Sequence, residues 1–86
     1  MPEISRILKI VDAKYAGAYL IRVRFADGVE GEIDLANELE GEVFEPLRDL
    51  QLFKQFRLDP DTRTIVWPNG ADLAPEFVRG LVRLAA

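Results

Sequence analysis

The chain has 86 residues, a formal net charge of −4 and neither cysteine nor histidine. Its length suffices for one small core, and its composition, 49% hydrophobic and 30% charged, excludes wholesale disorder, so we expect residues 1–86 to form a single domain. Disulfides and thiolate sites are excluded. No apolar run approaches the roughly 20 residues that span a bilayer. Residues 1–3 are not the basic start of a secretory signal, and we expect a cytoplasmic protein.

Alternating side chains predict the first part of a β-sheet. Residues 3–11 are apolar and β-branched enough for a first strand, which residues 13–17 interrupt. In residues 19–25 and 29–35, apolar side chains occupy odd positions and mostly charged ones even positions, as in strands with one buried face. Residues 3–35 therefore predict three consecutive strands.

The turn between the second and third strands contains Asp27-Gly28, which resembles a two-residue hairpin turn. Such a turn would place Phe25 opposite Glu30 and expose one apolar face, because a one-residue slip exchanges the faces of a strand. A three-residue loop, residues 26–28 with Gly28 left-handed, instead pairs Phe25 with Val29 and Ile21 with Ile33. On the outer face this register pairs arginine with glutamate, Arg24 with Glu30 and Arg22 with Glu32.

The rest of the chain predicts two main helices around a second hairpin. Asp34 is placed to cap a short turn that Gly41 ends, and a helix follows from Pro46 with Leu47, Leu50 and Phe53 on one stripe. A loop over residues 60–63 would pair Leu58 with Ile65 and Phe56 with Trp67. The closing helix, Pro75 to about Leu84, would bury Phe77, Val78, Leu81 and Val82 and expose Arg79 and Arg83.

These elements predict an α+β fold: a small two-layer domain in the order β-β-β-α-β-β-α. We expect one antiparallel sheet of about five strands with two main helices on one face.

The stretch WPNGAD, residues 67–72, joins the fifth strand to the closing helix. Pro68, Asn69 and Gly70 are typical turn residues, and Asp72 is positioned to cap the helix that starts with Pro75. Trp67 is expected in the core, with its indole N–H bonded to an acceptor. The turn is therefore interpreted as mainly architectural. The alternative is a small-ligand or enzymatic site around it, for which an oligomer interface is one option.

Three separated phrases, VRFADGVEGEIDL, GEVFEPLRD and TIVWPNGADLAPEFV, resemble the small bacterial family known as domain of unknown function 2442. The resemblance spans nearly the whole chain and implies a compact α+β fold. Relatives sometimes carry an added helix-turn-helix domain, which we do not expect in a chain ending at Ala86. They are often encoded beside another small protein in an arrangement resembling a toxin–antitoxin pair. The family supplies no catalytic residues, and its implied signature is Trp67, Asn69, Gly70, Asp72 and Pro75.

The residue inventory does not favour an enzyme. Ser5 is the one serine, and without histidine or cysteine no Ser-His-Asp or Cys-His nucleophile can form. Asp59-x-Asp61 begins like a calcium loop, but Arg63 stands where a third oxygen ligand belongs. No glycine pattern that cradles phosphate is present. We therefore expect no catalytic residues, metal or cofactor, and a non-enzymatic role.

Charge distribution predicts the kind of partner. The net charge and a pI of about 4.7 disfavour direct nucleic-acid binding by the chain alone. Residues 27–45 contain no lysine or arginine, and their acidic side chains could form a lobe that binds a basic protein, as in an antitoxin-like or regulatory member of a two-protein module. Such a run also serves plain solvation, and a homodimer is left open. The candidate partner surface comprises Glu30, Glu32, Glu38, Glu40, Glu42 and Glu45.

Overall fold

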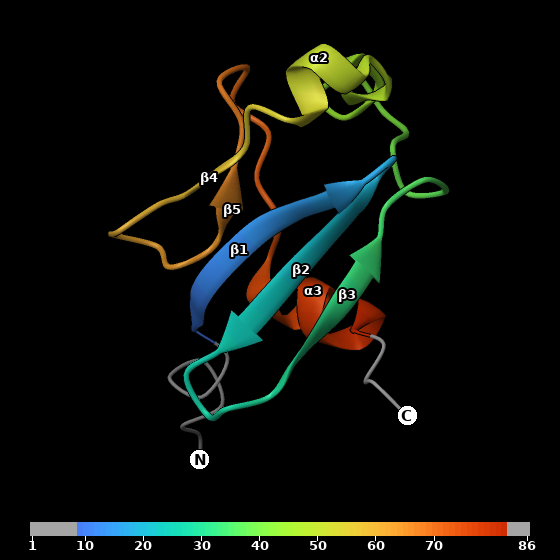
Figure 1. The fold of residues 1–86 in the computed structure, drawn as a ribbon. Coiled ribbons are helices and arrows are strands. Elements are labelled where there is room, and N and C mark those ends of the chain that lie inside the picture. The colour runs from blue at the N-terminus through green and yellow to red at the C-terminus, as the bar shows by residue number, and fades with distance from the viewer. Residues whose placement is uncertain (1–8, 83–86) are drawn as a thin grey trace.

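The computed structural model describes residues 9–82 as a small α+β structure with two sheets (Figure 1). The predicted order of strands and helices is found, but the five strands do not form one sheet. β1, β2 and β3 form a three-stranded antiparallel sheet, and β4 and β5 form a separate two-stranded one. The elements are β1 (Ile10–Gly17), β2 (Leu20–Phe25), β3 (Glu30–Asp34), η1 (Glu45–Arg48), α2 (Leu50–Phe53), β4 (Arg57–Leu58), β5 (Ile65–Val66) and α3 (Pro75–Leu81).

The β2–β3 hairpin has the predicted register. Ile21 lies opposite Ile33, and the Phe25 N–H donates to the Val29 carbonyl at 2.8 Å across the loop of residues 26–28. Gly28 has a φ of 93°, the left-handed conformation that glycine adopts without steric cost. Because both faces of the hairpin favour the same alignment, residue parity was enough to determine the turn.

The predicted first strand is wrong in its position. Residues 3–8 of the expected strand lie outside the described residues, and β1 runs through residues 13–17, where a break was expected. Register shifts flank Val11 and Ala16, so Ala13 and Tyr15 pair with the buried Val23 and Ile21. A bulge changes which positions face the core, and pairing with β2 overrides the weak strand propensity of this segment.

The second hairpin is short, because β4 and β5 have two residues each. Leu58 pairs with Ile65 as predicted, and residues 60–63 form the loop, closed by an Asp59 N–H bond to the Thr64 carbonyl at 2.9 Å. The ladder does not continue to Phe56 and Trp67, which meet instead through their rings at 6.3 Å.

The predicted helix from Pro46 is divided into two short pieces. Asp49 has an extended backbone with ψ of 113°, which ends η1, and its side chain accepts the Gln51 N–H at 3.0 Å, which begins α2. Leu47 and Phe53 are buried as expected, whereas Leu50 is exposed. An Asx-type hydrogen bond thus competes with a continuous helix.

Among the described helices, α3 alone covers a face of the three-stranded sheet. In Figure 1, α3 lies behind β2 and β3, whereas α2 lies beyond one end of the sheet, so the expected pair of helices on one face is not found. α3 buries Val78 but leaves Phe77 40% exposed, contrary to the predicted buried face, and the predicted continuation to Leu84 lies outside the described residues. The core consists of Ile10, Ile21, Val23, Phe25, Ile33, Leu35, Leu39, Leu47, Phe53, Ile65, Trp67, Ala71, Leu73 and Val78.

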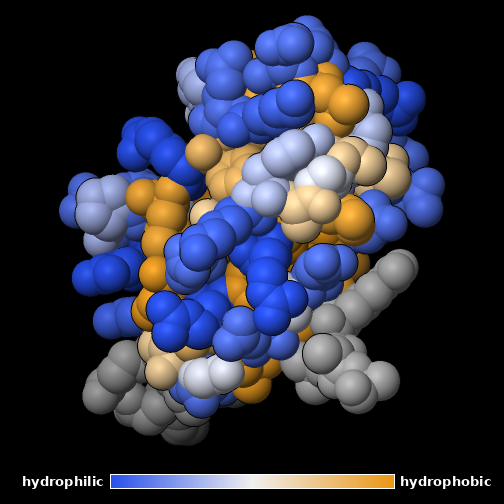
Figure 2. Space-filling model, in the orientation of Figure 1, coloured by the Kyte–Doolittle hydropathy of each residue, from blue (hydrophilic) through white to orange (hydrophobic). Residues whose placement is uncertain are grey.

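The outer face of the three-stranded sheet is charged. Figure 2 shows hydrophilic residues along the middle of this face. Arg24 lies opposite Glu30 and Arg22 opposite Glu32, as predicted, but the ion pair forms diagonally, between Arg22 Nη2 and Glu30 Oε2 at 3.1 Å. A diagonal neighbour is within reach of a long side chain, so register alone does not choose the partner.

Two glycine substitutions test the hairpin loop. Gly28→Ala should lower the free energy of unfolding by about 1 to 2 kcal/mol, because its left-handed backbone strains any residue with a Cβ. Gly80→Ala is the matched control: it lies within α3 with no atom within 4 Å of an added Cβ, and should raise the free energy of unfolding by about 0.4 to 1 kcal/mol. Urea unfolding measures both, and equal effects would contradict the loop geometry.

Candidate functional site

Trp67 of the WPNGAD turn is part of the core. It is 3% exposed, and its indole N–H donates to the Phe53 carbonyl at 2.8 Å. Its ring lies against Phe53 and Phe56, with centroids 5.8 and 6.3 Å away. The indole donor is therefore already used within the chain, as the sequence predicted.

Asn69 and Gly70 form the tip of the turn. The Gly70 N–H donates to the Trp67 carbonyl at 3.0 Å, and Gly70 adopts a φ of 94°. The Asn69 side chain accepts the Ala71 N–H at 3.2 Å and donates to the Val43 carbonyl at 2.9 Å. The second bond, which sequence reasoning missed, ties the turn to Val43, 26 residues earlier in the chain. The sequence indicated this bond only through the asparagine itself, because the turn uses the side-chain oxygen of Asn69 and not its side-chain N–H.

Asp72 is not the predicted helix cap. It forms an antiparallel bridge with Val66, and the next residue, Leu73, donates its N–H to the Ile65 carbonyl at 3.1 Å. The residue preceding α3 is Ala74, which gives no side-chain cap, and Pro75 begins the helix. Strand-like pairing holds Asp72 too far before the helix to cap it, and its side chain is exposed. Asp72 is the one acidic residue of the turn.

The acidic residues of the candidate partner surface fall into two groups. Glu30 is paired with Arg22, and Glu32 lies opposite the same arginine on the sheet. Glu38, Glu40 and Glu42 are exposed between β3 and η1, and Glu45 is exposed as the first residue of η1. No lysine or arginine of residues 9–82 forms an ion pair with these four glutamates. We call residues 38–45 the acidic segment.

The acidic segment is held against the core at several points. Leu39 is buried, and the Glu45 N–H donates to the Gly41 carbonyl at 2.8 Å. Arg48 Nε donates to the Leu39 carbonyl at 3.0 Å, and the Tyr19 hydroxyl donates to the Arg48 carbonyl. These bonds lie beside a pocket of about 380 Å³ lined by Tyr19, Ala36, Asn37, Leu39, Glu40 and Arg48. Arg48, which the sequence did not single out, positions backbone here rather than neutralising a glutamate.

A second, more apolar hollow brings the two predicted sets of residues together. It has a volume of about 240 Å³ and lies between the segment that follows β3 and the segment that enters α3. Glu38 of the acidic segment and Asp72 of the turn both line it, although they are distant in sequence. We call it the groove; it is lined by Leu35, Glu38, Leu39, Phe44, Asp72, Leu73, Ala74 and Phe77.

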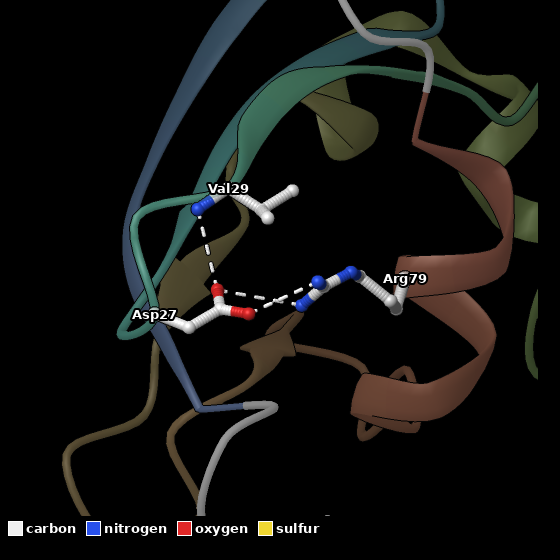
Figure 3. Close-up of polar contacts among 3 residues, drawn as sticks. All are labelled: Asp27, Val29 and Arg79. Atoms are coloured by element: carbon white, nitrogen blue, oxygen red, sulfur yellow. Dashed lines mark hydrogen bonds and ion pairs between the residues drawn. The ribbon is translucent and has the colours of Figure 1, made fainter.

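Arg79, predicted to lie on a solvated helix face, instead joins α3 to the β2–β3 loop (Figure 3). Its Nη2 lies 3.0 Å from Asp27 Oδ2, and its guanidinium lies 5.0 Å from the Phe25 ring centroid. The hydrogen bond from Arg79 is the largest effect that lowers the pKa of Asp27 from its ordinary value of 3.8, and the Val29 N–H contributes. This ion pair neutralises Asp27, the first acidic residue of the acidic run, residues 27–45.

Metal binding and membrane insertion are two further properties that the described residues bear on. Among the residues that the structure describes, no three acidic side chains converge as metal ligands would. Within residues 9–82 there is also no helix of the length and apolar character that a membrane crossing requires.

A comparison with known families shows which family the chain belongs to. A model described as a protein of unknown function, DUF2442, matches residues 10–82. The chain belongs to the DUF2442 family. The match covers most of the chain and confirms the resemblance drawn from its three phrases. No curated protein and no solved structure matches this DUF2442 chain significantly.

Substitutions in the turn separate the two polar side chains. Asn69→Ala should lower the free energy of unfolding by about 1 to 2 kcal/mol, because two hydrogen bonds are lost. Asp72→Ala should change it by less than about 0.5 kcal/mol, because the carboxylate is exposed and caps no helix. Thermal and urea unfolding measure both variants. An Asp72→Ala variant as unstable as Asn69→Ala would show that Asp72 does cap the helix.

Acid titration tests the ion pair of Asp27 with Arg79. A carboxylate whose pKa is lower in the folded state stabilises above its unfolded pKa, and the contribution disappears as the pH falls through the folded pKa. The stability advantage of wild type over Asp27→Asn should thus be constant from about pH 7 to pH 5 and shrink below about pH 4.

Asp61→Asn is the control for this titration, because Asp61 has no ion pair among the described residues. Urea unfolding across the pH range measures both differences. An Asp27→Asn difference that stays constant or grows on acidification would contradict the assignment.

Proposed function

We propose that this DUF2442 protein is a small non-enzymatic interaction domain that binds a basic protein partner through its acidic segment. The observation that carries this proposal is the set of four exposed glutamates, Glu38, Glu40, Glu42 and Glu45, without an ion pair among the described residues. A role as the antitoxin-like or regulatory member of a two-protein module, in the cytoplasm, is part of the same proposal.

The contrast within the acidic run supports this choice of surface. Where the run crosses the sheet and its loop, Asp27 and Glu30 have arginine partners from α3 and β2. Where it leaves the sheet, the glutamates alternate along a loop that contributes Leu39 to the core. Acidic side chains crowded on one segment repel one another, and a basic partner would relieve that repulsion.

Anchoring of the segment also favours binding. The Asn69 bond to Val43, the Arg48 bond to Leu39 and the turn closed by Glu45 hold its backbone in the unbound protein. A surface that is ordered before binding loses less conformational entropy when the partner arrives. The glutamate side chains are therefore carried by an ordered backbone. Their electrostatic attraction for a basic partner should be strong at low salt.

The alternative, a ligand or enzymatic site around the WPNGAD turn, has less support. The indole N–H of Trp67 and the side-chain amide of Asn69 are engaged in intramolecular bonds, and Gly70 supplies backbone geometry. Among the polar side chains of the turn this leaves Asp72, one carboxylate, to contact a ligand.

Co-purification at two salt concentrations tests the proposal. The tagged chain, expressed in its native cell, should recover a basic protein at about 0.1 M salt and lose most of it at about 0.5 M, because screening shortens the reach of surface charges. The triple variant Glu40→Gln, Glu42→Gln, Glu45→Gln should lose the partner at both concentrations.

A charge-matched control keeps the acidic segment intact. The variant Asp12→Asn, Glu32→Gln, Asp61→Asn removes the same number of charges elsewhere and should retain the partner. A recovered partner that is acidic, that survives high salt, or that binds the triple variant as well as the control would refute binding through the acidic segment. Recovery of no partner at low salt would do the same.

A further inference from the structure

The groove exposes apolar side chains of the described residues. Phe77 lies in the first turn of α3 and is 40% exposed, and Phe44, which also lines the groove, is half-buried. The buried Leu35, Leu39 and Leu73 form part of the lining. Large apolar side chains left in water cost solvation free energy that an apolar occupant would recover.

The size of the groove fits one large side chain. Its volume of about 240 Å³ exceeds the roughly 150 Å³ of an apolar protein cavity that holds a benzene ring. A single phenylalanine or leucine side chain therefore has room to enter.

The charge of the lining determines what flanks that side chain. Glu38 and Asp72 line the groove with no lysine or arginine beside them in the lining, and Glu76 lies exposed next to Phe77 in the chain. In the described part of the chain neither Glu38 nor Asp72 is in an ion pair. An occupant that carried acidic groups would meet repulsion, whereas lysine or arginine beside its apolar side chain would be attracted.

We propose that the groove binds one large apolar side chain from a segment of the basic partner, with basic residues on either side of it. This inference rests on the proposed function and adds an anchor to it. The acidic segment attracts the partner over a distance, and the groove fixes its register through a desolvated side chain. A second copy of this chain is disfavoured as the occupant, because its net charge of −4 would bring like charges together.

Three short peptides test the groove without the partner. Acetyl-Lys-Phe-Lys-amide, acetyl-Lys-Ser-Lys-amide and acetyl-Glu-Phe-Glu-amide are titrated into ¹⁵N-labelled protein, and amide chemical shifts are followed by NMR. The first peptide should shift amides of the groove lining, and it should bind at least about tenfold more tightly than each of the others. Equal binding of the Phe and Ser peptides, or shifts away from the groove, would overturn the apolar anchor. Equal binding of the two Phe peptides would overturn its basic flanks.

A filling variant supplies the second arm. Ala74 lines the groove, is exposed and has an extended backbone that accepts a larger residue, so Ala74→Phe should block the groove and weaken the Lys-Phe-Lys peptide at least about tenfold. Ala16→Phe places the same side chain on β1, outside the groove, and should leave binding unchanged. Circular dichroism confirms that both variants are folded. Equal peptide binding by the two variants would overturn the inference.

The two proposals fail separately. If the co-purified partner is salt-sensitive and lost in the triple glutamine variant but retained by Ala74→Phe, the anchor is wrong and binding through the acidic segment stands. If no partner is recovered while the Lys-Phe-Lys peptide still binds the groove selectively, the groove is a site whose occupant is not the proposed partner, and the inference about that partner is wrong.

Discussion

The Phe53 ring joins the separate parts of this fold. It is fully buried and meets Tyr15 of β1, Tyr19 of the β1–β2 turn, Phe56 beside β4 and Trp67 after β5, with centroids 5.2 to 6.4 Å apart. Its own carbonyl accepts the indole N–H of Trp67. The two sheets do not share one continuous hydrogen-bonded ladder in residues 9–82, and this aromatic cluster is one of the contacts that hold them together, beside the bond from the Ile10 N–H to the Arg63 carbonyl.

The candidate surface depends on the same cluster. Trp67 fixes the start of the WPNGAD turn, and the turn places Asn69 where its amide reaches the Val43 carbonyl. Tyr19 packs on Phe53 and donates to the Arg48 carbonyl, and Arg48 in turn holds Leu39. The acidic segment is therefore fastened from both sides by residues whose positions follow from the core. Loss of aromatic packing would release the segment as well as destabilise the fold.

Local rules predicted the parts of the fold in which every local signal agreed. The β2–β3 register followed from parity because Ile21, Phe25 and Ile33 all favour one alignment. The rules failed where a backbone group had two possible partners. Asp49 caps α2 and so divides a helix, and Asp72, predicted to be a cap, lies in a bridge with Val66 instead. In β1, a bulge at Val11 breaks the alternation on which strand prediction depends.

For the candidate site too, some features could be predicted from the sequence and others depend on tertiary structure. The acidic run was visible in the sequence, but sequence could not show which of its carboxylates have partners, because Arg22 and Arg79 reach Glu30 and Asp27 from other elements. Nor could it show that Glu38 and Asp72 line one hollow, since that depends on how the turn packs against the segment after β3. Charge in the sequence thus suggested the basic partner that we propose. The fold shows which of these carboxylates form ion pairs among the described residues, and it adds an apolar hollow lined by Glu38 and Asp72, so the proposed interaction rests on shape as well as on charge.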